Sequence, residues 1–343
     1  MVFLYPGAIH IHSIHSDGTG TIQEIAQSAK KAGLNWIIIT DHNNMDGVEG
    51  IYDGVCVIIG EEISPPTESH YLAFNIKTPI NPNTSANEYI KKVKEQGGFG
   101  FIAHPDASEL RKNTYKPLRW ANWDIKDFGG IEIWNYMSDW GDYYDDINPL
   151  KALHSYLFRN NVLAGPTKNV LAWWDNLNNE TSEIIPAIGG IDAHALNIKK
   201  FFVPVTIFPY QNILGTITNF IHLDNVLPDE FEGRKLAILN AIKSAKNLIV
   251  NRVWSRKCSN PSFYIQNRYQ KAYAGDVIEL DSCSKMIVEL PLKADIKIIY
   301  NGKVIIQKKT KSLEFNKLDK GKYRMEAYYK NRPWIFSNPI LVK

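Results

Sequence analysis

Along the first 250 residues, short apolar runs alternate with amphipathic segments. The runs Trp36–Thr40, Val55–Ile59 and Phe99–Ala103 have the length of strands and are apolar almost throughout, which is typical of strands covered on both faces. In Thr21–Ala32 and Ser85–Gln96 the apolar residues recur at helical spacing, and a glycine follows each segment. The pattern therefore predicts a repeated strand-then-helix fold. The further expected strands are Ala8–Ser13, His70–Ile76, Gly130–Trp134 and Ile184–Ile191, and the further expected helices are Pro149–Asn160 and Gly233–Lys246.

Beyond residue 252 the pattern changes to short alternating strands separated by turn residues. The turn signals are Ala274-Gly275-Asp276, Asn301-Gly302 and Asp319-Lys320-Gly321, of which Asn301-Gly302 is the strongest hairpin signal in the chain. We therefore expect two domains. Residues 1–252 would form an α/β domain, and residues 253–343 a small all-β antiparallel sandwich.

Charge divides the chain at about the same point. Residues 1–250 carry 20 Lys and Arg against 28 Asp and Glu, whereas residues 251–343 carry 19 against 8, and the whole chain has a net charge of +3. A basic domain could bind nucleic acid or an anionic surface. Its lysines, however, are scattered among strand-like residues, which favours solvated strand faces and argues against a nucleic-acid partner.

The composition, with 44% hydrophobic and 22% charged residues, is that of a globular protein. Three scattered cysteines, Cys56, Cys258 and Cys283, are too few for a disulfide framework or a thiolate zinc site and fit a reducing compartment. No stretch approaches the roughly 20 apolar residues of a membrane span, and the first residues lack a signal-peptide pattern. We therefore expect a cytoplasmic protein without a membrane partner.

Candidate chemistry begins at AIHIHSIHSDGTG, Ala8 to Gly20. Side chains two apart on a strand share a face, so His10 and His12 should point to the same side and could grip a metal ion. Asp17, in the turn that follows, could add an oxygen ligand. A His-x-His pair alone fits a structural role as well as a metal site.

Other metal-type side chains lie within a few residues of the carboxyl end of a predicted strand. In strand-helix barrels the chemistry is built on that rim by residues from several strands. This recurrence favours a polynuclear metal site over a set of structural histidines. The residues are His10, His12, His42, Glu62, His104, Asp192 and His194.

These motifs carry a family resemblance. The runs HIHSIHSDGTGT, ITDHNN, GEEIS, HYLAFNI, AHPD, GIEIWN and GGIDAH, in this order, resemble the polymerase and histidinol phosphatase (PHP) superfamily of metal-dependent hydrolases. They look most like its CehA/McbA-type branch, and WIFSNPI resembles the small β domain that this branch often carries. The resemblance covers about residues 7–250 and implies a distorted seven-fold, TIM-like (β/α)7 barrel that holds up to three metals.

The resemblance also implies how the ligands would group. His10, His12, Glu62 and Asp192 would hold the first metal, Glu62, His70 and His104 the second, and Asp17, His42 and His194 the third. Glu62 is preferred over its neighbour Glu61 because the family glutamate is followed by an aliphatic residue and then Ser or Thr. The role of Glu61 stays open.

Imidazole and carboxylate ligands suit zinc, manganese or iron, and nothing in the sequence selects among these divalent ions. Two or three of them could lower the pKa of a bridging water and supply hydroxide. We expect a hydrolase, first a phosphoesterase that acts on a small anionic phosphate ester. The alternatives are a carboxylic ester, amide or carbamate hydrolase of CehA/McbA type and a non-enzymatic carbohydrate- or protein-binding module; a homo-oligomer stays open.

Several further residues have candidate roles. His15 is a candidate acid for the leaving group, although an exposed loop histidine would look the same, and Asn135 could contact a ligand or water. Among Arg111, Lys112 and Arg119, one could reach a phosphate oxygen, and Arg111 is the candidate. Glu132, in the Asn135 strand, is uncertain, and Lys168–Glu183 is the expected place for a lid or an oligomer contact. The tryptophans that could wall an apolar pocket are Trp120, Trp123, Trp134, Trp140, Trp173 and Trp174.

Overall fold

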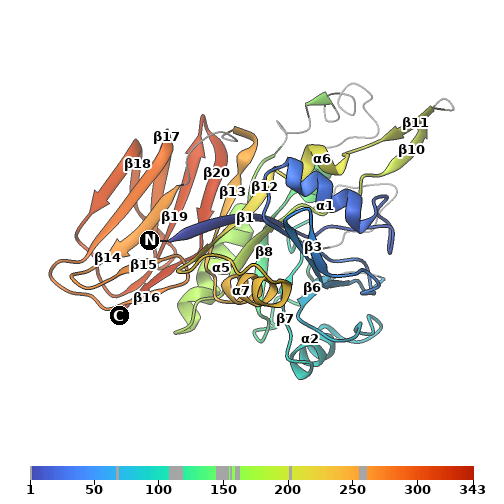
Figure 1. Ribbon diagram of the computed structural model, residues 1–343. Coiled ribbons are helices and arrows are strands. Elements are labelled where there is room, and N and C mark those ends of the chain that lie inside the picture. Colours follow the sequence, from blue (N-terminus) through green and yellow to red (C-terminus); the bar gives the residue numbers. More distant parts are fainter. Residues whose placement is uncertain are drawn as a thin grey trace.

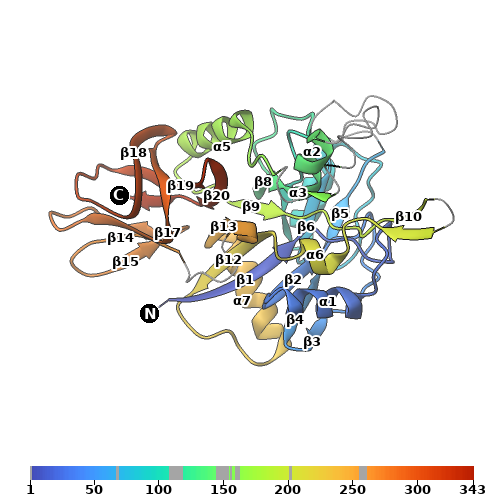
Figure 2. The same ribbon diagram turned by 90° about the horizontal axis from the view of Figure 1, so that it is seen from above.

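Two bodies of strands make up the molecule, and helices cover one of them (Figure 1). The structure is a computed structural model. It describes residues 2–66, 69–107, 119–143, 154, 157, 158, 163–200, 203–254 and 261–343. Seen from above, the strands of the C-terminal part stand at one side and the helix-covered strands at the other (Figure 2).

The chain begins in a sheet whose inner strands are parallel. β1 (Phe3–Ile9) pairs in parallel with β2 (Trp36–Ile39), and β2 pairs in parallel with β4 (Val55–Ile59), while β3 (Gly50–Tyr52) adds an antiparallel edge. Between β1 and β2, α1 (Ile22–Lys31) begins at Thr21, whose side chain accepts from the Glu24 N–H in a capping box. The helix buries Ile25, Ala26 and Ala29 against this sheet. These elements confirm the predicted opening strand-helix-strand unit.

A second sheet has the strand order β5-β6-β7-β8-β9. Its first three strands are antiparallel neighbours, whereas β7, β8 and β9 are parallel. The only described helix between β6 and β7 is α2 (Ala86–Glu95), and α3 (Tyr136–Tyr143) follows β8 directly. A regular strand-helix repeat is therefore interrupted here. The strands are β5 (Glu61–Ile63), β6 (Tyr71–Phe74), β7 (Phe99–Ile102), β8 (Gly130–Asn135) and β9 (Ala187–Gly190).

Backbone hydrogen bonds join the two sheets at both edges. β4 runs into β5 with only Gly60 between them, and a Cβ at Gly60 would lie 2.7 Å from the carbonyl oxygen of Ala73. Beyond the end of β2, His42 forms a parallel β-bridge with Glu62. Beyond the end of β1, Ile11 forms a parallel β-bridge with Ala193, which follows β9. The ends of β1, β2, β5 and β9 therefore converge on one place in the molecule.

The first sheet continues without a break into the C-terminal part. β12 (Ile217–Leu223) pairs antiparallel with β1, β13 (Asn247–Asn251) with β12, and β20 (Arg332–Ser337) with β13. Helix α7 (Phe231–Lys243) lies between β12 and β13, and short α6 (Tyr210–Ile213) follows the hairpin of β10 (Asn197–Lys200) and β11 (Val203–Thr206). Leu248 and Val250 of β13 share a core with C-terminal residues such as Trp334.

The C-terminal part is rich in strands, as expected. Long β17 (Lys285–Tyr300) and β18 (Lys303–Phe315) form a hairpin whose turn residues, Asn301 and Gly302, both have positive φ, as the sequence predicted. The pairing is antiparallel except between β16 and β21, which are parallel neighbours. The remaining strands and the short helix before them are η2 (Arg252–Trp254), β14 (Ser262–Gln266), β15 (Lys271–Tyr273), β16 (Val277–Ile278), β19 (Gly321–Tyr329) and β21 (Ile340–Val342).

Helix α5 (Lys168–Glu180) is held against the C-terminal strands by a group of buried charges that we call the α5 anchor: Asp175, Lys322, Arg324 and Glu326. Arg324 donates to both carboxylate oxygens of Asp175, at 2.6 Å each, and to Glu326 at 2.7 Å. Lys322 donates to the carbonyl of Asn178, near the helix end, and to that of Thr181 at 2.9 Å. These contacts tie α5 to the C-terminal strands, and the expectation of a lid or an oligomer contact in Lys168–Glu183 stays a prediction.

The mixed α/β fold and the β-rich C-terminal region are confirmed. The predicted Ala8–Ser13 strand was wrong in its bounds, because β1 ends at Ile9 and His10 leaves the extended conformation with φ 66°. The expected helix Pro149–Asn160 lies mostly outside the described residues. None of the helices in the described ranges is long and apolar enough to cross a membrane.

Candidate metal centre

Glu62 is the centre of the site. Its Oε2 atom lies 3.3 Å from Nε2 of His10, 3.3 Å from Nε2 of His12 and 3.0 Å from Nδ1 of His42. Its Oε1 atom lies 2.8 Å from Nδ1 of His70 and 3.2 Å from Nε2 of His104. One carboxylate, 1% exposed, thus faces five imidazoles that come from four segments of the chain.

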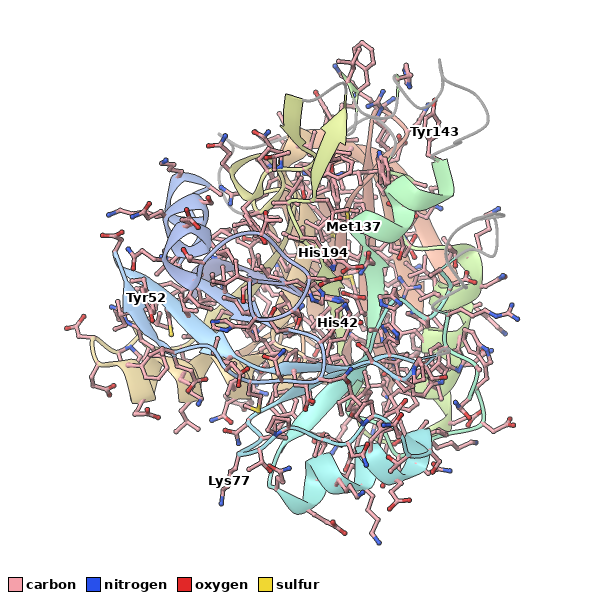
Figure 3. All side chains as sticks on the ribbon, turned by 90° about the vertical axis from the view of Figure 1, so that its right-hand side faces the viewer. His42, Tyr52, Lys77, Met137, Tyr143 and His194 are labelled. Carbon is pink, nitrogen blue, oxygen red and sulfur yellow. The ribbon has the colours of Figure 1, made fainter. Side chains whose placement is uncertain are left out.

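Asp192 and Asp17 extend this cluster. Asp192 Oδ1 lies 3.5 Å from His10 Nε2 and 3.3 Å from His12 Nε2. Asp17 lies 3.2 Å from His194 Nε2 and 3.6 Å from His42 Nε2. His42 and His194 lie at the centre of the face seen in Figure 3, with Met137 of α3 beside them. The structure therefore brings all nine predicted ligands together; their binding of metal stays a prediction. They are His10, His12, Asp17, His42, Glu62, His70, His104, Asp192 and His194.

The turn that carries Asp17 is fixed by two residues whose role the sequence analysis missed. Buried Asp41 accepts from the Ser13 backbone at 2.7 Å, from the Ser13 hydroxyl at 2.6 Å and from the Ser16 hydroxyl at 2.5 Å. Tyr210 donates its hydroxyl to the His12 carbonyl at 2.7 Å, and the same oxygen accepts from the Gly20 N–H at 3.3 Å. The Asp-His order in ITDHNN was the available signal for Asp41; Tyr210 lies about 190 residues from this turn and had none.

Glu132 of β8 supports two members of the cluster, His10 and His104, by hydrogen bonds. Its Oε1 atom accepts from Nδ1 of His10 at 2.8 Å, and its Oε2 atom accepts from the backbone N–H of His104 at 2.7 Å and from the Asn135 side chain at 3.0 Å. With its Nδ1 occupied in this way, His10 presents Nε2 to Glu62 and Asp192. Glu132 was uncertain from the sequence, because alternation along its strand did not say whether its side chain points inward or outward.

The backbone is strained where the candidate ligands sit. His10, His104 and Asp192 have φ values of 66°, 28° and 57°, in the left-handed region that non-glycine residues rarely adopt. Each such residue costs of order 1–3 kcal/mol and persists only where its surroundings enforce it. Three ligands share this property, which points to a geometry built for binding and not for stability alone.

The charges of the cluster shift one another's protonation. Burial opposes charge on Glu62, but the surrounding histidines, His10 first, outweigh it and hold the pKa of Glu62 well below its usual range. Burial also disfavours charge on His42, yet the carboxylates of Glu62 and Asp17 raise the pKa of His42 to about 10. Burial and the neighbouring His194 lower the pKa of His12 to about 4. His12 is thus neutral and ready to donate an electron pair.

The donor set fits divalent transition ions. Nε2 of His10, Nε2 of His12 and Oε2 of Glu62 are buried without a hydrogen-bond partner, and all three face one another. Orphaned buried polar atoms are rare in folded proteins, and a shared cation would satisfy these three together. Imidazole nitrogens and carboxylate oxygens without thiolates suit zinc, manganese or iron.

Among the residues that the structure describes, four groups of side chains have ligand atoms close enough to share an ion. Glu62, His70 and His104 form one, which is the expected second group, and His10, His12 and Glu62 form three quarters of the expected first. In the third group His12 lies beside the expected members Asp17, His42 and His194, and His10, His104 and Asp192 form a fourth group that we did not expect; which residues share an ion stays a prediction.

A small cavity of about 30 Å³ opens beside the cluster. Its lining includes His104, Glu132 and Asn135 of the cluster and its surroundings, together with Trp134, Asp139 and Thr167. Asn135 lines this cavity, and its expected contact with a ligand or water stays a prediction. Of the six tryptophans only Trp134 lines this cavity; for the others the structure shows packing, as for Trp123 against Trp173 and Trp140 against Phe208.

The remaining candidates have different surroundings. His15 is exposed, and its described hydrogen bonds are made by its backbone, so it belongs to none of the four groups. Arg111 and Lys112 lie outside the described residues, and Arg119 is exposed. Glu61 points away from the cluster, where its carboxylate accepts from the Ile80 N–H at 2.9 Å, and burial raises the pKa of Glu61 to about 7.

Comparison with known families gives a match to the PHP domain model over residues 8–232. The chain belongs to the PHP domain family. All nine residues of the cluster fall within the matched PHP domain. MJ1587, an uncharacterized protein of Methanocaldococcus jannaschii, is 31% identical to this chain over 147 residues, which cover 37% of this chain and 80% of MJ1587.

Solved structures show weaker likenesses to this PHP protein. A two-domain protein from Bacteroides vulgatus that contains a predicted PHP-like metal-dependent phosphoesterase is 15% identical, with a TM-score of 0.49 over 98% of this chain and 95% of the other. PsfC from Pseudomonas syringae is 12% identical, with a TM-score of 0.41 over 68% of this chain and 88% of its own.

Proposed function

We propose that this PHP protein is a metal-dependent hydrolase of a small phosphate ester, with two to three divalent ions of zinc, manganese or iron. The observation that carries the proposal is Glu62, whose two oxygens face five imidazoles while Oε2 and two of the facing nitrogens lack hydrogen-bond partners. A degenerate barrel that served only as a binding module would have no reason to keep nine such side chains together.

When bound, the ions would lower the pKa of coordinated water and neutralise negative charge on the substrate. Glu62 would be shared between ion positions, because His10 and His12 face one of its oxygens and His70 and His104 the other. Asp17, His42 and His194, with His12 at their border, would form the outermost position. Because the side chain of Asp17 is 55% accessible, that position would lie nearest to solvent and therefore to an arriving substrate.

Charge favours an anionic substrate. The cluster contributes three carboxylates, those of Asp17, Glu62 and Asp192, and its other members are imidazoles, which bind metal in their neutral form. Three divalent ions would leave this set with a net positive charge, also when the carboxylate of Glu132 beside it is counted. A phosphate oxyanion would reduce that charge, whereas a neutral ester, amide or carbamate would not. His15 and Arg111 stay our candidates for protonating the leaving group and for contacting phosphate.

We further propose that the strands close into a distorted seven-stranded, TIM-like barrel, in the order β1, β2, β4 with β5, β6, β7, β8, β9. The parallel bridges His42–Glu62 and Ile11–Ala193 support this closure, because they join the two sheets at both edges. The barrel would form a domain of residues 1–252, with residues 253–343 as the second domain, and the motif order supports the CehA/McbA-type branch of the family.

Metal analysis and a substrate panel test the function. Metal-supplemented protein should hold two to three transition ions per chain by elemental analysis, and less than one ion would refute the polynuclear site.

Chromogenic phosphomonoesters, phosphodiesters and carboxylic esters should then be compared as substrates. We expect phosphoester hydrolysis to fall at least about 100-fold in His194→Ala. His222→Ala, which removes a buried histidine at the other end of the β1–β12 pair, is the matched control and should keep its activity. Preferential carboxylic-ester cleavage would instead favour the CehA/McbA-type alternative.

A further inference from the structure

Glu132 is buried, charged and in contact with two candidate ligands, yet it belongs to none of the four ligand groups. Both of its oxygens are already occupied, Oε1 by the His10 ring and Oε2 by the His104 backbone and the Asn135 side chain. A carboxylate engaged in this way has its lone pairs directed at N–H donors. Glu132 therefore differs from Glu62, whose Oε2 atom has no hydrogen-bond partner.

The two main contacts of Glu132 end on strained residues. His10 and His104 both have left-handed backbones, and Glu132 binds the ring of the first and the backbone N–H of the second. His10 and His104 face different oxygens of Glu62, at 3.3 Å from Oε2 and 3.2 Å from Oε1. A single side chain thus reaches both halves of the cluster, although β1 and β7 are far apart in the sequence.

The neighbouring strand is shaped around this carboxylate. Gly190 of β9 pairs in register with Asn135 of β8. A Cβ at Gly190 would lie 1.6 Å from Oε1 of Glu132 and 3.1 Å from Cβ of His10. Even alanine at position 190 would therefore displace the carboxylate from the His10 ring.

We propose that Glu132 is a positioning residue that holds His10 and His104, and with them the two halves of the metal centre, in the correct relative position. By accepting from Nδ1–H it fixes the tautomer of His10 that directs Nε2 to the metal, and by accepting from the His104 N–H it holds the turn that presents the His104 ring. This inference rests on the proposed function, because it requires that His10 and His104 bind metal.

The test measures zinc binding by metal-free protein, by competition with a chromogenic chelator. Glu132→Gln preserves shape but leaves one acceptor oxygen for two N–H donors, so His10 or His104 loses its partner. We expect zinc to bind about 10–100-fold more weakly. The matched control is Glu61→Gln. Glu61 is a buried glutamate next to Glu62 on β5, and in the described structure its side chain accepts only from the Ile80 N–H. The zinc affinity of this variant should equal that of the wild type.

Two further measurements separate positioning from mere stability. In histidine-labelled protein, the Nδ1–H proton of His10 should give a strongly downfield resonance that Glu132→Gln abolishes and Glu61→Gln retains. Gly190→Ala, which keeps the carboxylate but moves it, should also weaken zinc binding. A Glu132→Gln protein that melts earlier yet binds zinc with unchanged affinity would overturn the inference. Wild-type protein that binds no zinc would instead overturn the proposed function itself.

Discussion

Two groups of buried charges lie in this molecule, and they are built differently. In the α5 anchor, Arg324 pairs with both oxygens of Asp175 and with Glu326, and Tyr328 donates to the remaining oxygen of Glu326 at 2.9 Å. None of its residues has a left-handed backbone. In the histidine cluster, by contrast, three ligand atoms lack hydrogen-bond partners and three ligands are strained.

The difference distinguishes a charge network that serves stability from one that serves binding. Burying charges is tolerable when each is paired or hydrogen-bonded, and the anchor meets that condition with protein groups alone, Lys322 by donating to backbone carbonyls. The cluster meets it only in part, so it keeps free electron pairs at a cost in folding stability, and bound cations would offset that cost. Substitutions should therefore affect activity at the cluster and stability at the anchor.

The largest expected effect is at Glu62. Glu62→Gln removes the charge that faces five imidazoles, and we expect turnover of phosphate esters to fall by about 10³-fold or more. Steady-state assays with parallel elemental analysis would check this, and bound metal should fall with activity. Retention of both full activity and full metal content would show that the cluster is not the catalytic centre.

At the anchor, Arg324→Met should remove the cation and leave Asp175 and Glu326 buried without it. We expect the free energy of unfolding to fall by about 3–5 kcal/mol, measured by urea denaturation, with activity per folded molecule preserved. Lys126→Met, which breaks an exposed pair with Glu180 of the same α5 helix, is the control and should leave the midpoint unchanged. A loss of activity at full stability would contradict the division of roles.

The pH dependence of the metal-free protein should show the strain of the cluster. Burial opposes protonation of His42, but Glu62 and Asp17 raise its pKa from 6.5 to about 10. The folded state therefore favours the protonated ring, and this stabilisation is complete below pH 6.5 and lost as the pH rises towards 10. We expect the melting temperature of chelator-treated protein to fall over that range. Zinc-loaded protein should show a smaller fall, because the metal replaces the proton, and equal falls would argue against His42 as a ligand.

The smallest effect should come from Tyr210→Phe. Without the hydroxyl, the buried Gly20 N–H and the His12 carbonyl lose a partner, which should cost about 1–3 kcal/mol of stability. Because this hydroxyl also ties down the turn that carries Asp17, activity should fall modestly, by a factor below that of His194→Ala. Tyr269→Phe, at a residue 83% exposed, provides the control. Equal activity and stability in both variants would remove Tyr210 from the architecture of the site.

Much of this site was visible in the sequence because its ligands occur beside apolar runs. Val55–Ile59 could be read as a buried strand from its composition, and the strand is β4, with Glu62 three residues beyond. Glu62 was separated from Glu61 by motif spacing alone. The structure gives the physical reason, since neighbouring residues on β5 point to opposite sides.

What the sequence could not supply was the set of contacts between strands. Glu132 matters because β8 lies beside β9, where Gly190 leaves room for its carboxylate, and register across strands is not written in either segment. His10 was misjudged for a related reason. Alternation predicts an extended strand through residue 13, whereas the bonds made by its ring and by neighbouring residues hold it in a left-handed conformation.

The continuous sheet also bears on how the protein is made. β1 lies between β2 and β12, and β12 is synthesised some 200 residues after β1. Likewise β13 pairs with β20, which lies close to the C-terminus. Until those partners arrive, each strand presents an unpaired edge that another nascent chain could join. Contacts of such long sequence separation slow folding, so synthesis of this protein should depend on chaperones that shield β1 and β13 until their partner strands have emerged.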